Sequence, residues 1–276
     1  MRSGTLARLR VGTSGWSYRE WRGHVYPARL PSSRWLAHYT GLFDTVEVNA
    51  SFYRLLKRSD TLQWRQATPA GFLFALKGSR FITHFLKLRN CAPALRRFFA
   101  PLAPLGDKAG PIVFQTAYQF EADPRRLEEF LDLLPTGRRY AFEFRHPSWH
   151  TPAVRRILRR RNAAFVPFEI GRLRGPNLVT ADFVYVRLHG RKPGYKGDYT
   201  RRALAPWAKW LRQQIRRGRD AYVFFDNTAE GAAAVRNAQT LRAMVNGEEK
   251  SRGARRRPAR LLNDMSQAEQ AHVASR

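Results

Sequence analysis

The sequence has a single cysteine, Cys91, among its 276 residues. An internal disulfide and a metal site built from several cysteines are therefore excluded. Long hydrophobic runs are missing as well: no stretch of about eighteen apolar residues occurs, so we expect neither a membrane span nor a membrane partner. The N-terminus also lacks the apolar core of a signal peptide. Together these absences predict a cytoplasmic protein with reduced thiol chemistry.

Acidic residues are scarce: 21 Asp and Glu face 50 Lys and Arg, which gives a net charge of +29. Most of this excess lies in residues 1–245, since the remaining stretch holds seven basic and four acidic residues. A body this basic attracts polyanions by counterion release, so nucleic acid is one possible partner. The alternative is that arginines simply cover solvated helix faces, as Arg155, Arg156 and Arg159 do in one amphipathic segment.

Several well-known catalytic motifs are absent. The chain has no P-loop, no G-x-G-x-x-G dinucleotide fingerprint and no H-E-x-x-H zinc motif. The segment 12–15 is not a nucleophile elbow, because Trp16 stands where the last glycine belongs. The cofactor therefore stays unknown. We predict no metal, although oxygen and nitrogen ligands for a divalent cation are available in Glu47, Glu143, Asp226 and His189.

Apolar runs of strand length alternate with amphipathic stretches of helix length. We expect strands at 9–13, 45–49, 72–77, 112–115, 140–145, 164–168, 183–189 and 221–226. We expect helices at 34–41, 61–68, 92–102, 124–134, 152–161, 203–217 and 231–245. Eight alternating units predict an α/β fold, a TIM-type (β/α)₈ barrel of parallel strands, with a doubly wound open sheet as the alternative.

Two features depart from a regular barrel. Only residues 169–182 separate the sixth and seventh strands, and they include Gly171, Gly175 and Pro176, so the helix after strand 6 should be reduced or missing. Residues 246–276 change to a charged, polar composition broken by glycine and proline. We predict a single domain over 1–245 and a basic, disordered tail over 246–276.

Polar residues close the predicted strands. Because side chains alternate with period two, the apolar face of each strand should pack on helices and the face with small and polar residues should point into the barrel. Carboxyl ends of barrel strands surround one axis, so these polar groups should share one site. The catalytic candidates are Glu47, Lys77, Glu143 and His189. The binding candidates on the same strand ends are Asn49, Gln115, Arg145, Arg187, Asp226 and Asn227.

The loops after the strands add aromatic and basic residues. Segment 12–18 carries glycines for a tight turn and backbone amides that could bind an anion. Further binding candidates from these loops are Trp16, Tyr18, Tyr53, Arg80, His84, His146 and Trp149.

A family resemblance rests on the same segments. Gly-Thr-Ser-Gly-Trp-Ser-Tyr at 12–18, Thr-Val-Glu-Val-Asn at 45–49, Phe-Glu-Phe-Arg-His at 142–146 and Val-Arg-Leu-His-Gly at 186–190 resemble the YecE-like proteins, the domain of unknown function seventy-two. Ser-Phe-Tyr at 51–53, Phe-Ala-Leu-Lys at 74–77, Arg80, Ile-Thr-His at 82–84 and Ser-Trp at 148–149 fit it too. The resemblance covers about 11–245 and implies a TIM-type barrel with a cleft at its carboxyl face. It supplies no established activity. Asp226 at the end of the last strand and the Thr116-Ala117 pair depart from the family pattern.

The first functional hypothesis is an enzyme that acts on a small anionic substrate, such as a phosphorylated sugar or a nucleotide fragment. Arg145, Arg187 and Lys77 would bind the anion, and Glu143 or Glu47 would exchange protons with His189 as the partner. The carboxylate pair would also suit glycoside hydrolysis, and a lysine beside arginines would suit Schiff-base chemistry.

Two other classes stay open. A nucleic-acid binder or processor would use the basic surface and the aromatic rim of the cleft. A non-catalytic interaction protein would show a cleft filled by its own side chains, and a salt-bridge network of the two glutamates with Lys77, Arg145 and Arg187 would then be purely structural.

Overall fold

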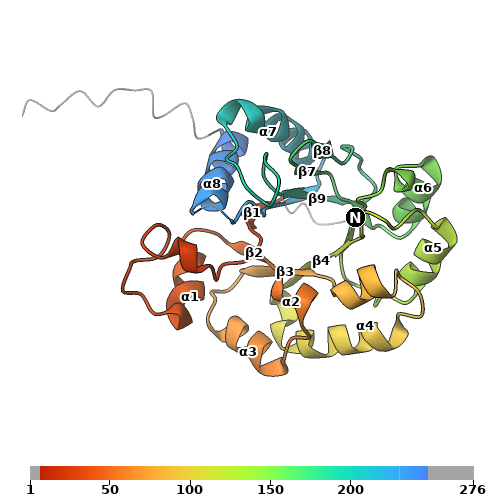
Figure 1. Ribbon diagram of the computed structural model, residues 1–276, viewed down its shortest axis with the longest axis horizontal. Helices are drawn as coiled ribbons and strands as arrows, with labels where there is room; N and C mark the ends of the chain where they lie inside the picture. Colours follow the sequence, from red (N-terminus) through yellow and green to blue (C-terminus); the bar gives the residue numbers. More distant parts are fainter. Residues whose placement is uncertain (1–6, 230, 248–276) are drawn as a thin grey trace, which may run out of the picture.

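The computed structural model describes residues 7–229 and 231–247, and its strands form two five-stranded sheets (Figure 1). The first sheet has the order β1 (Leu9–Thr13), β10 (Asp220–Phe225), β9 (Phe183–Leu188), β7 (Phe168–Ile170) and β8 (Leu173–Arg174). The second has the order β2 (Thr45–Val48), β3 (Leu73–Lys77), β4 (Ala109–Gln115), β5 (Tyr140–Glu143) and β6 (Ala164–Phe165). Every pairing is parallel except that of β7 with β8. The predicted α/β class is confirmed, whereas the ladders are two sheets and do not form one closed barrel.

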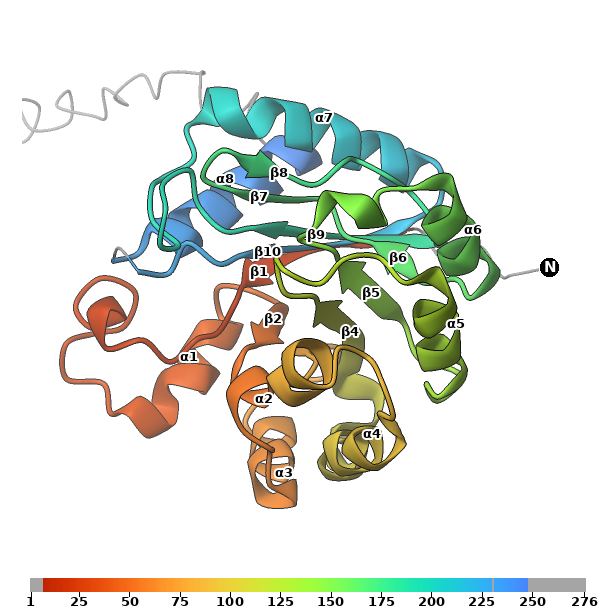
Figure 2. The same cartoon turned by 45° about the vertical axis from the view of Figure 1, so that its right-hand side comes forward.

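Helices follow most strands. They are α1 (Trp35–Thr40), α2 (Ala50–Tyr53), α3 (Arg58–Gln66), α4 (Ala92–Phe99), α5 (Pro124–Asp132), α6 (Pro152–Arg160), α7 (Arg201–Arg216) and α8 (Ala233–Asn246). In both views α7 and α8 cover one side of the first sheet, while α3 and α4 cover the outer side of the second (Figures 1 and 2). Among the helices that the structure describes, none has the length and hydrophobicity needed to span a bilayer.

The outer helices form where the sequence combines a cap with an apolar stripe. In α6 the buried residues Val154, Ile157 and Leu158 recur at helical spacing, and Thr151 accepts a hydrogen bond from the Val154 amide. Helix α7 begins in the same way, because Thr200 accepts from the amide of Ala203. The arginines of these helices occupy the other faces. This arrangement is the solvated arginine surface that the sequence predicted as one alternative.

The sixth strand differs from its prediction. Residues 164–168 were expected to form one strand, but β6 ends at Phe165 and β7 begins at Phe168. Pro167 lies between them, and proline has no N–H to donate to a ladder. The chain changes sheets here: β6 pairs with β5, and β7 pairs with β9.

The segment after β7 contains no helix. Residues 171–182 hold only the two-residue strand β8, which turns back onto β7 as a hairpin. The predicted loss of the helix after the sixth strand is thus confirmed. Other short elements had not been predicted: α2, a π-helical turn at Phe81–Phe85, and 3₁₀ turns that include Arg19–Trp21 and Pro147–Trp149.

The strands separate two apolar layers, as the period-two pattern predicted. Val46, Phe74 and Phe142 belong to the large core between strands and helices. A smaller cluster lies on the opposite strand faces, between the two sheets, and comprises Ala75, Val113, Ala141, Ala164, Val166, Phe183, Tyr185, Tyr222 and Phe224. Small residues on β3, β4 and β5 therefore leave room for the aromatic rings of β9 and β10.

The two sheets meet near the carboxyl ends of β1 and β2. Ser14 forms a parallel bridge with Glu47, and the Gly15 amide donates to the Glu47 carbonyl over 2.7 Å. Gly12 permits this approach, since a Cβ at that position would collide with the carbonyl oxygen of Thr45. The predicted tail at 246–276 lies outside the described residues apart from its first two positions.

Candidate functional site

Arg187 of β9 is the centre of a buried network at the carboxyl ends of the strands. Its Nε and Nη2 donate to the two oxygens of Glu47 over 2.9 and 2.7 Å. Its Nη1 donates to Glu143 over 2.7 Å and to Gln115 over 3.1 Å, and Nη2 also lies 3.3 Å from Asp226. We call the set Glu47, Gln115, Glu143, Arg145, Arg187, His189 and Asp226 the central network. Three carboxylates around one fully buried guanidinium leave Arg187 few donors for a ligand.

Glu47 is held on its other side by two hydroxyl groups. Ser14 Oγ donates to Oε1 over 2.7 Å, and Tyr185 Oη donates to Oε2 over 2.6 Å. Tyr185 shares the strand face of Arg187 because the two are separated by one residue on β9. The Glu47 carboxylate is therefore saturated by donors, which fits a structural anchor.

His189 lies between two carboxylates. Its Nδ1 is 2.9 Å from Asp226, and its Nε2 is 3.2 Å from Glu143 and 3.0 Å from Nη2 of Arg145. Asp226 lies within hydrogen-bond distance of Nδ1, and Nε2 lies between the Glu143 carboxylate and the Arg145 guanidinium, so each ring nitrogen has a polar partner.

Arg145 joins the network from the end of β5. It forms an ion pair with Glu143, and its Nη1 donates to the Tyr118 hydroxyl over 2.9 Å. Its guanidinium also lies 4.7 Å from the ring centre of Phe168. The Nε of this buried arginine has no hydrogen-bond partner among the described residues.

The surrounding cations control the acidity of the network. Burial alone would raise the pKa of Glu143, but Arg145, Arg187 and His189 hold that pKa well below its usual range. Asp226 follows the same pattern: burial opposes ionisation, and the His189 hydrogen bond and Arg187 lower its pKa. Both carboxyl groups are thus ionised at neutral pH.

Lys77 at the end of β3 lies beside the network without joining it. Its Nζ sits 4.0 Å from the ring centre of Phe52 and makes no hydrogen bond or ion pair with residues 7–229 or 231–247. Burial, followed by the charge of Arg187, lowers its pKa to about 8. His84 lies against the same ring, 5.3 Å between centroids, and burial with Lys77 lowers its pKa to about 4. At neutral pH His84 is therefore uncharged.

Three predicted binding residues lie at the rim. Tyr18 donates to the Ser14 carbonyl, and Asn49 donates to Asp226 over 3.3 Å. Asn227 instead supports the loop after β9, because its amide donates to the Gly197 carbonyl and to Asn237. The Oδ1 atoms of both asparagines are buried and have no partner among the described residues.

Other predicted binding residues are placed away from the network. Trp16 packs edge-on against Trp64, and the fully buried Trp149 stacks on Phe144 at 4.5 Å. His146 accepts from the Ser148 amide in a local turn. Tyr53 is 74% exposed, and Arg80 stands over the ring of Phe85, close enough for its charge to lower the pKa of His84. Binding roles for these five residues stay predictions.

Four residues that the structure brings to the site were not predicted from the sequence. Ser14 and Tyr185 brace Glu47, and Tyr118 contacts Arg145. Tyr195 covers His189 with its ring, 5.7 Å between centroids. The period-two face of β9 already pointed to Tyr185, whereas the two loop tyrosines carry no signal of periodicity.

Three backbone amides of segment 12–18, where an anion site was expected, already donate to protein groups. The amides of Thr13, Ser14 and Gly15 donate to Tyr39 Oη, to the Phe225 carbonyl and to the Glu47 carbonyl. Within the described ranges, no three His, Cys, Asp or Glu side chains are grouped so that they could hold a metal ion.

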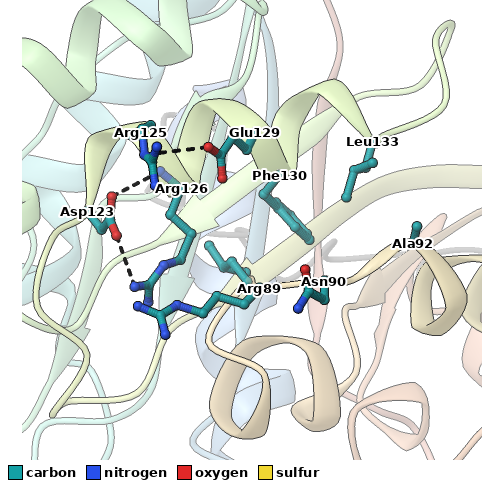
Figure 3. Close-up of a pocket in the computed structure, with 10 residues that line it drawn as sticks. Arg89, Asn90, Ala92, Asp123, Arg125, Arg126, Glu129, Phe130 and Leu133 are labelled. Carbon is teal, nitrogen blue, oxygen red and sulfur yellow. Dashed lines mark hydrogen bonds and ion pairs between the residues drawn. The ribbon is translucent and has the colours of Figure 1, made fainter.

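Hollows of about 480, 630, 790 and 550 Å³ lie outside the network in the described part of the chain. The one of about 480 Å³ lies beside α5, where Arg125 pairs with Glu129 and Arg126 with Asp123, and none of the predicted site residues lines it (Figure 3). The one of about 630 Å³ we call the α2–α4 groove; it is lined by Phe52, Tyr53, Arg54, Leu55, Ser79, Arg80, Phe81, Phe85, Leu86, Asn90, Pro93, Ala94 and Arg97. This groove has exposed rings and arginines but no acidic residue.

Similarity searches connect the chain to proteins without an assigned function. It is 32% identical to the UPF0759 protein YecE of Escherichia coli over 142 residues, which is 50% of this chain and 49% of that protein. The match thus spans about half the length of YecE. The UPF0759 protein YunF of Bacillus subtilis is 24% identical over 84% of this chain and 93% of its own length.

Solved structures give the same relationship. A DUF72 family protein of Thermotoga maritima has a TM-score of 0.78 at 28% identity, covering 87% of this chain and 99% of that chain. One from Enterococcus faecalis, at 19% identity with a TM-score of 0.73, covers 86% and 95% and supports the fold alone. The family described as "Protein of unknown function DUF72" matches residues 10–261, beyond the boundary predicted at 245. The chain therefore belongs to the DUF72 family, as the YecE-like motifs indicated.

Proposed function

We propose that this chain is an enzyme that binds a small anionic substrate, such as a phosphorylated sugar or a nucleotide fragment, at the carboxyl ends of its parallel strands. The observation that carries the proposal is the His189 imidazole, which lies 2.9 Å from Asp226 and 3.2 Å from Glu143. An imidazole between two carboxylates suits general acid–base catalysis, because one side fixes its proton while the other exchanges one.

The residues take distinct roles in this proposal. Asp226 orients His189 through Nδ1, and Nε2 with Glu143 moves the proton of the substrate. Arg187 keeps Glu143 ionised and holds the carboxylates of Glu47 and Glu143 in place. The donors of Arg187 are already used by the carboxylates. We therefore assign the binding of the substrate anion to Arg145, whose Nε has no partner among the described residues, and to Lys77.

Unpaired polar atoms favour a ligand site over a purely structural network. A self-contained network would satisfy its buried groups, since an unpaired buried polar group costs about 1–3 kcal/mol. Here Nε of Arg145 and Oδ1 of Asn49 are buried and have no partner among the described residues. A substrate with acceptor and hydroxyl groups would complete these contacts.

We extend the proposal to the architecture: the two sheets are the halves of a TIM-type barrel. The Ser14–Glu47 bridge supports one junction, and the passage of the chain from β6 to β7 through Pro167 supports the other. Such a barrel would gather all eight carboxyl strand ends, where enzymes of this architecture hold their active sites.

A second candidate function is the binding of single-stranded nucleic acid in the α2–α4 groove. Tyr53, Phe81 and Phe85 are exposed there by 74%, 54% and 67%. Bases stack on such rings, and Arg54, Arg80 and Arg97 would contact the phosphates. This candidate uses the outer surface and not the central network.

The proposal is tested by a thermal-shift screen of the full chain against phosphosugars, nucleotides and short oligonucleotides, at low and moderate salt. A true ligand at one hundred times its Kd stabilises the native state by about 2.7 kcal/mol. We expect stabilisation by a small phosphorylated compound that persists at moderate salt. Product formation from each hit is then followed by NMR.

Two variants separate binding from chemistry. Arg145→Gln should remove the stabilisation by the ligand, whereas Glu143→Gln should keep binding and lower turnover by about 10²–10⁴-fold. Arg159→Gln, on an exposed helix position, is the matched control. Unchanged turnover in Glu143→Gln would overturn the assignment. Stabilisation by oligonucleotides alone, lost with salt, would favour the second candidate, and no stabilisation by any compound would favour a non-catalytic protein.

A further inference from the structure

Two buried lysines of this chain differ in their surroundings. Lys108 is 6% exposed and donates from Nζ to the carbonyls of Arg65 and Thr68 and to the Thr68 hydroxyl over 2.5–3.0 Å. This is the usual arrangement of a structural buried ammonium. Lys77 is 4% exposed, yet within the described part of the chain its Nζ contacts the Phe52 ring and has no oxygen acceptor.

The environment of Lys77 favours a reactive amine. With its pKa lowered to about 8, roughly a tenth of the side chain is uncharged at pH 7, compared with well under a thousandth for an ordinary lysine. The neutral form is the nucleophile in covalent amine catalysis, and a position beside another cation promotes it. Arg187 is that neighbouring cation.

Groups suited to proton transfer surround the amine. Uncharged His84 lies on the same Phe52 ring, and its Nδ1 is engaged with Thr83 Oγ1 at 2.8 Å, so Nε2 remains. The carboxylates of Asp226, Glu47 and Glu143 also act on Lys77 and favour positive charge on its nitrogen. Phe52 contacts Lys77 and also lines the α2–α4 groove, so the amine and the groove share this ring.

We propose that Lys77 forms a Schiff base with the carbonyl carbon of a small anionic aldehyde or ketone. This inference rests on the proposed function, because it places the substrate in the same site and narrows its class. Arg145 and Arg80 would hold the phosphate or carboxylate of the substrate. The carboxylates of the central network would stabilise the cationic iminium.

Formation of the Schiff base starts from the neutral amine of Lys77. The Nζ lone pair forms a bond to the carbonyl carbon, the C=O π electrons move to oxygen, and a proton passes from nitrogen to that oxygen to give a carbinolamine. A second proton, delivered by an acid of the site, then lets the hydroxyl leave as water while nitrogen donates its pair to carbon. The sum is amine, carbonyl and one proton giving iminium and water, with no oxidant or reductant.

The test is reductive trapping on the full chain. Glyceraldehyde 3-phosphate is added with sodium cyanoborohydride, which converts an iminium to a stable amine, and the labelled lysine is located by peptide mass spectrometry. We expect modification of Lys77 at least tenfold faster than of the exposed Lys57 or Lys87, with a rate that rises with pH and is half-maximal near pH 8. Lys108 is the internal control and should stay unmodified.

Three control experiments accompany the trapping experiment. Neutral glyceraldehyde should label Lys77 at least tenfold more slowly than the phosphorylated compound. Glycerol 3-phosphate, which has no carbonyl, should protect Lys77 and should itself stabilise the chain in the thermal-shift assay. Lys77→Arg should lose the fast labelling, and Lys108→Arg should retain it.

The outcomes distinguish the two proposals. Stabilisation by glycerol 3-phosphate without labelling of Lys77 would overturn the Schiff base and leave the proposed function standing. Labelling of Lys77 no faster than that of the surface lysines would overturn it too. Equally fast labelling by neutral glyceraldehyde would mean that the site does not recognise the phosphate, and the proposed anionic class of substrate would be wrong. If glycerol 3-phosphate does not stabilise the chain and Lys77 is not labelled, both proposals are rejected.

Discussion

At the residue scale, Arg187 determines whether the site is stable. Its guanidinium binds carboxylates from β2, β5 and the end of β10, and the side chain is fully buried. Removing the charge would leave these acids without their main counterion in a medium of low polarity. Breaking a buried pair in this way costs about 3–5 kcal/mol.

We therefore predict that Arg187→Met lowers the free energy of unfolding by about 3–5 kcal/mol in urea titrations. Arg159→Met, which removes an exposed helix arginine, should change it by at most about 0.5 kcal/mol. Equal effects of the two substitutions would mean that the central network contributes no stability. Failure of Arg187→Met to fold would agree with the prediction, because the loss would then exceed the total stability.

The pH dependence of the stability can also be traced to a single residue, His84. The pKa of His84 is lowered to about 4 by burial and by Lys77, Arg80 and Arg145, while an unfolded histidine titrates near 6.5. Between these values the unfolded chain takes up a proton that the native chain refuses. Stability should therefore fall as the pH drops from about 6.5 to about 4, and His84→Asn should remove this part of the slope.

Urea unfolding at pH 7, 5.5 and 4 checks this prediction, with His24→Asn at an exposed position as the control. Glu143 and Asp226 contribute in a lower window: because their pKa values are lowered, their stabilisation is lost only as the pH falls below the ordinary carboxyl range. An identical slope in His84→Asn and the unchanged chain would refute the assignment to His84.

At the element scale, the helices depend on their first residues. Thr200 precedes the sixteen-residue helix α7 and accepts from the Ala203 amide over 3.3 Å. The helix then buries Leu204, Trp207 and Leu211 against the core. Its start therefore determines how a whole apolar face meets the first sheet.

We predict that Thr200→Ala lowers the free energy of unfolding by about 1 kcal/mol, the usual value of an N-cap. Thr240→Ala is the matched control, since the Thr240 hydroxyl bonds back to the Arg236 carbonyl inside α8 and caps nothing. Chemical denaturation of both variants measures the difference. A loss at Thr240 as large as that at Thr200 would contradict a capping role.

At the scale of the whole molecule, the sequence predicted the alternation of strands and helices because each element carries its own period. It also predicted that Glu47, Glu143, Arg187 and His189 share one site, because parallel strands gather their carboxyl ends. The partners within the site were not predictable in this way. That Arg187 contacts Glu47, and not Lys77, depends on strand registers and sheet contacts that no local pattern encodes. The break at Pro167 and the packing of Trp149 in the core have the same origin.

The burial of the central network separates two kinds of electrostatics in one molecule. Arginines on the outer helices interact through water, where ions at physiological concentration screen charges beyond about 8 Å. The pairs around Arg187 exclude solvent, so dissolved ions weaken them far less. A concentrated salt solution would thus screen the arginines on the surface of this protein and leave the arrangement of its carboxylates intact.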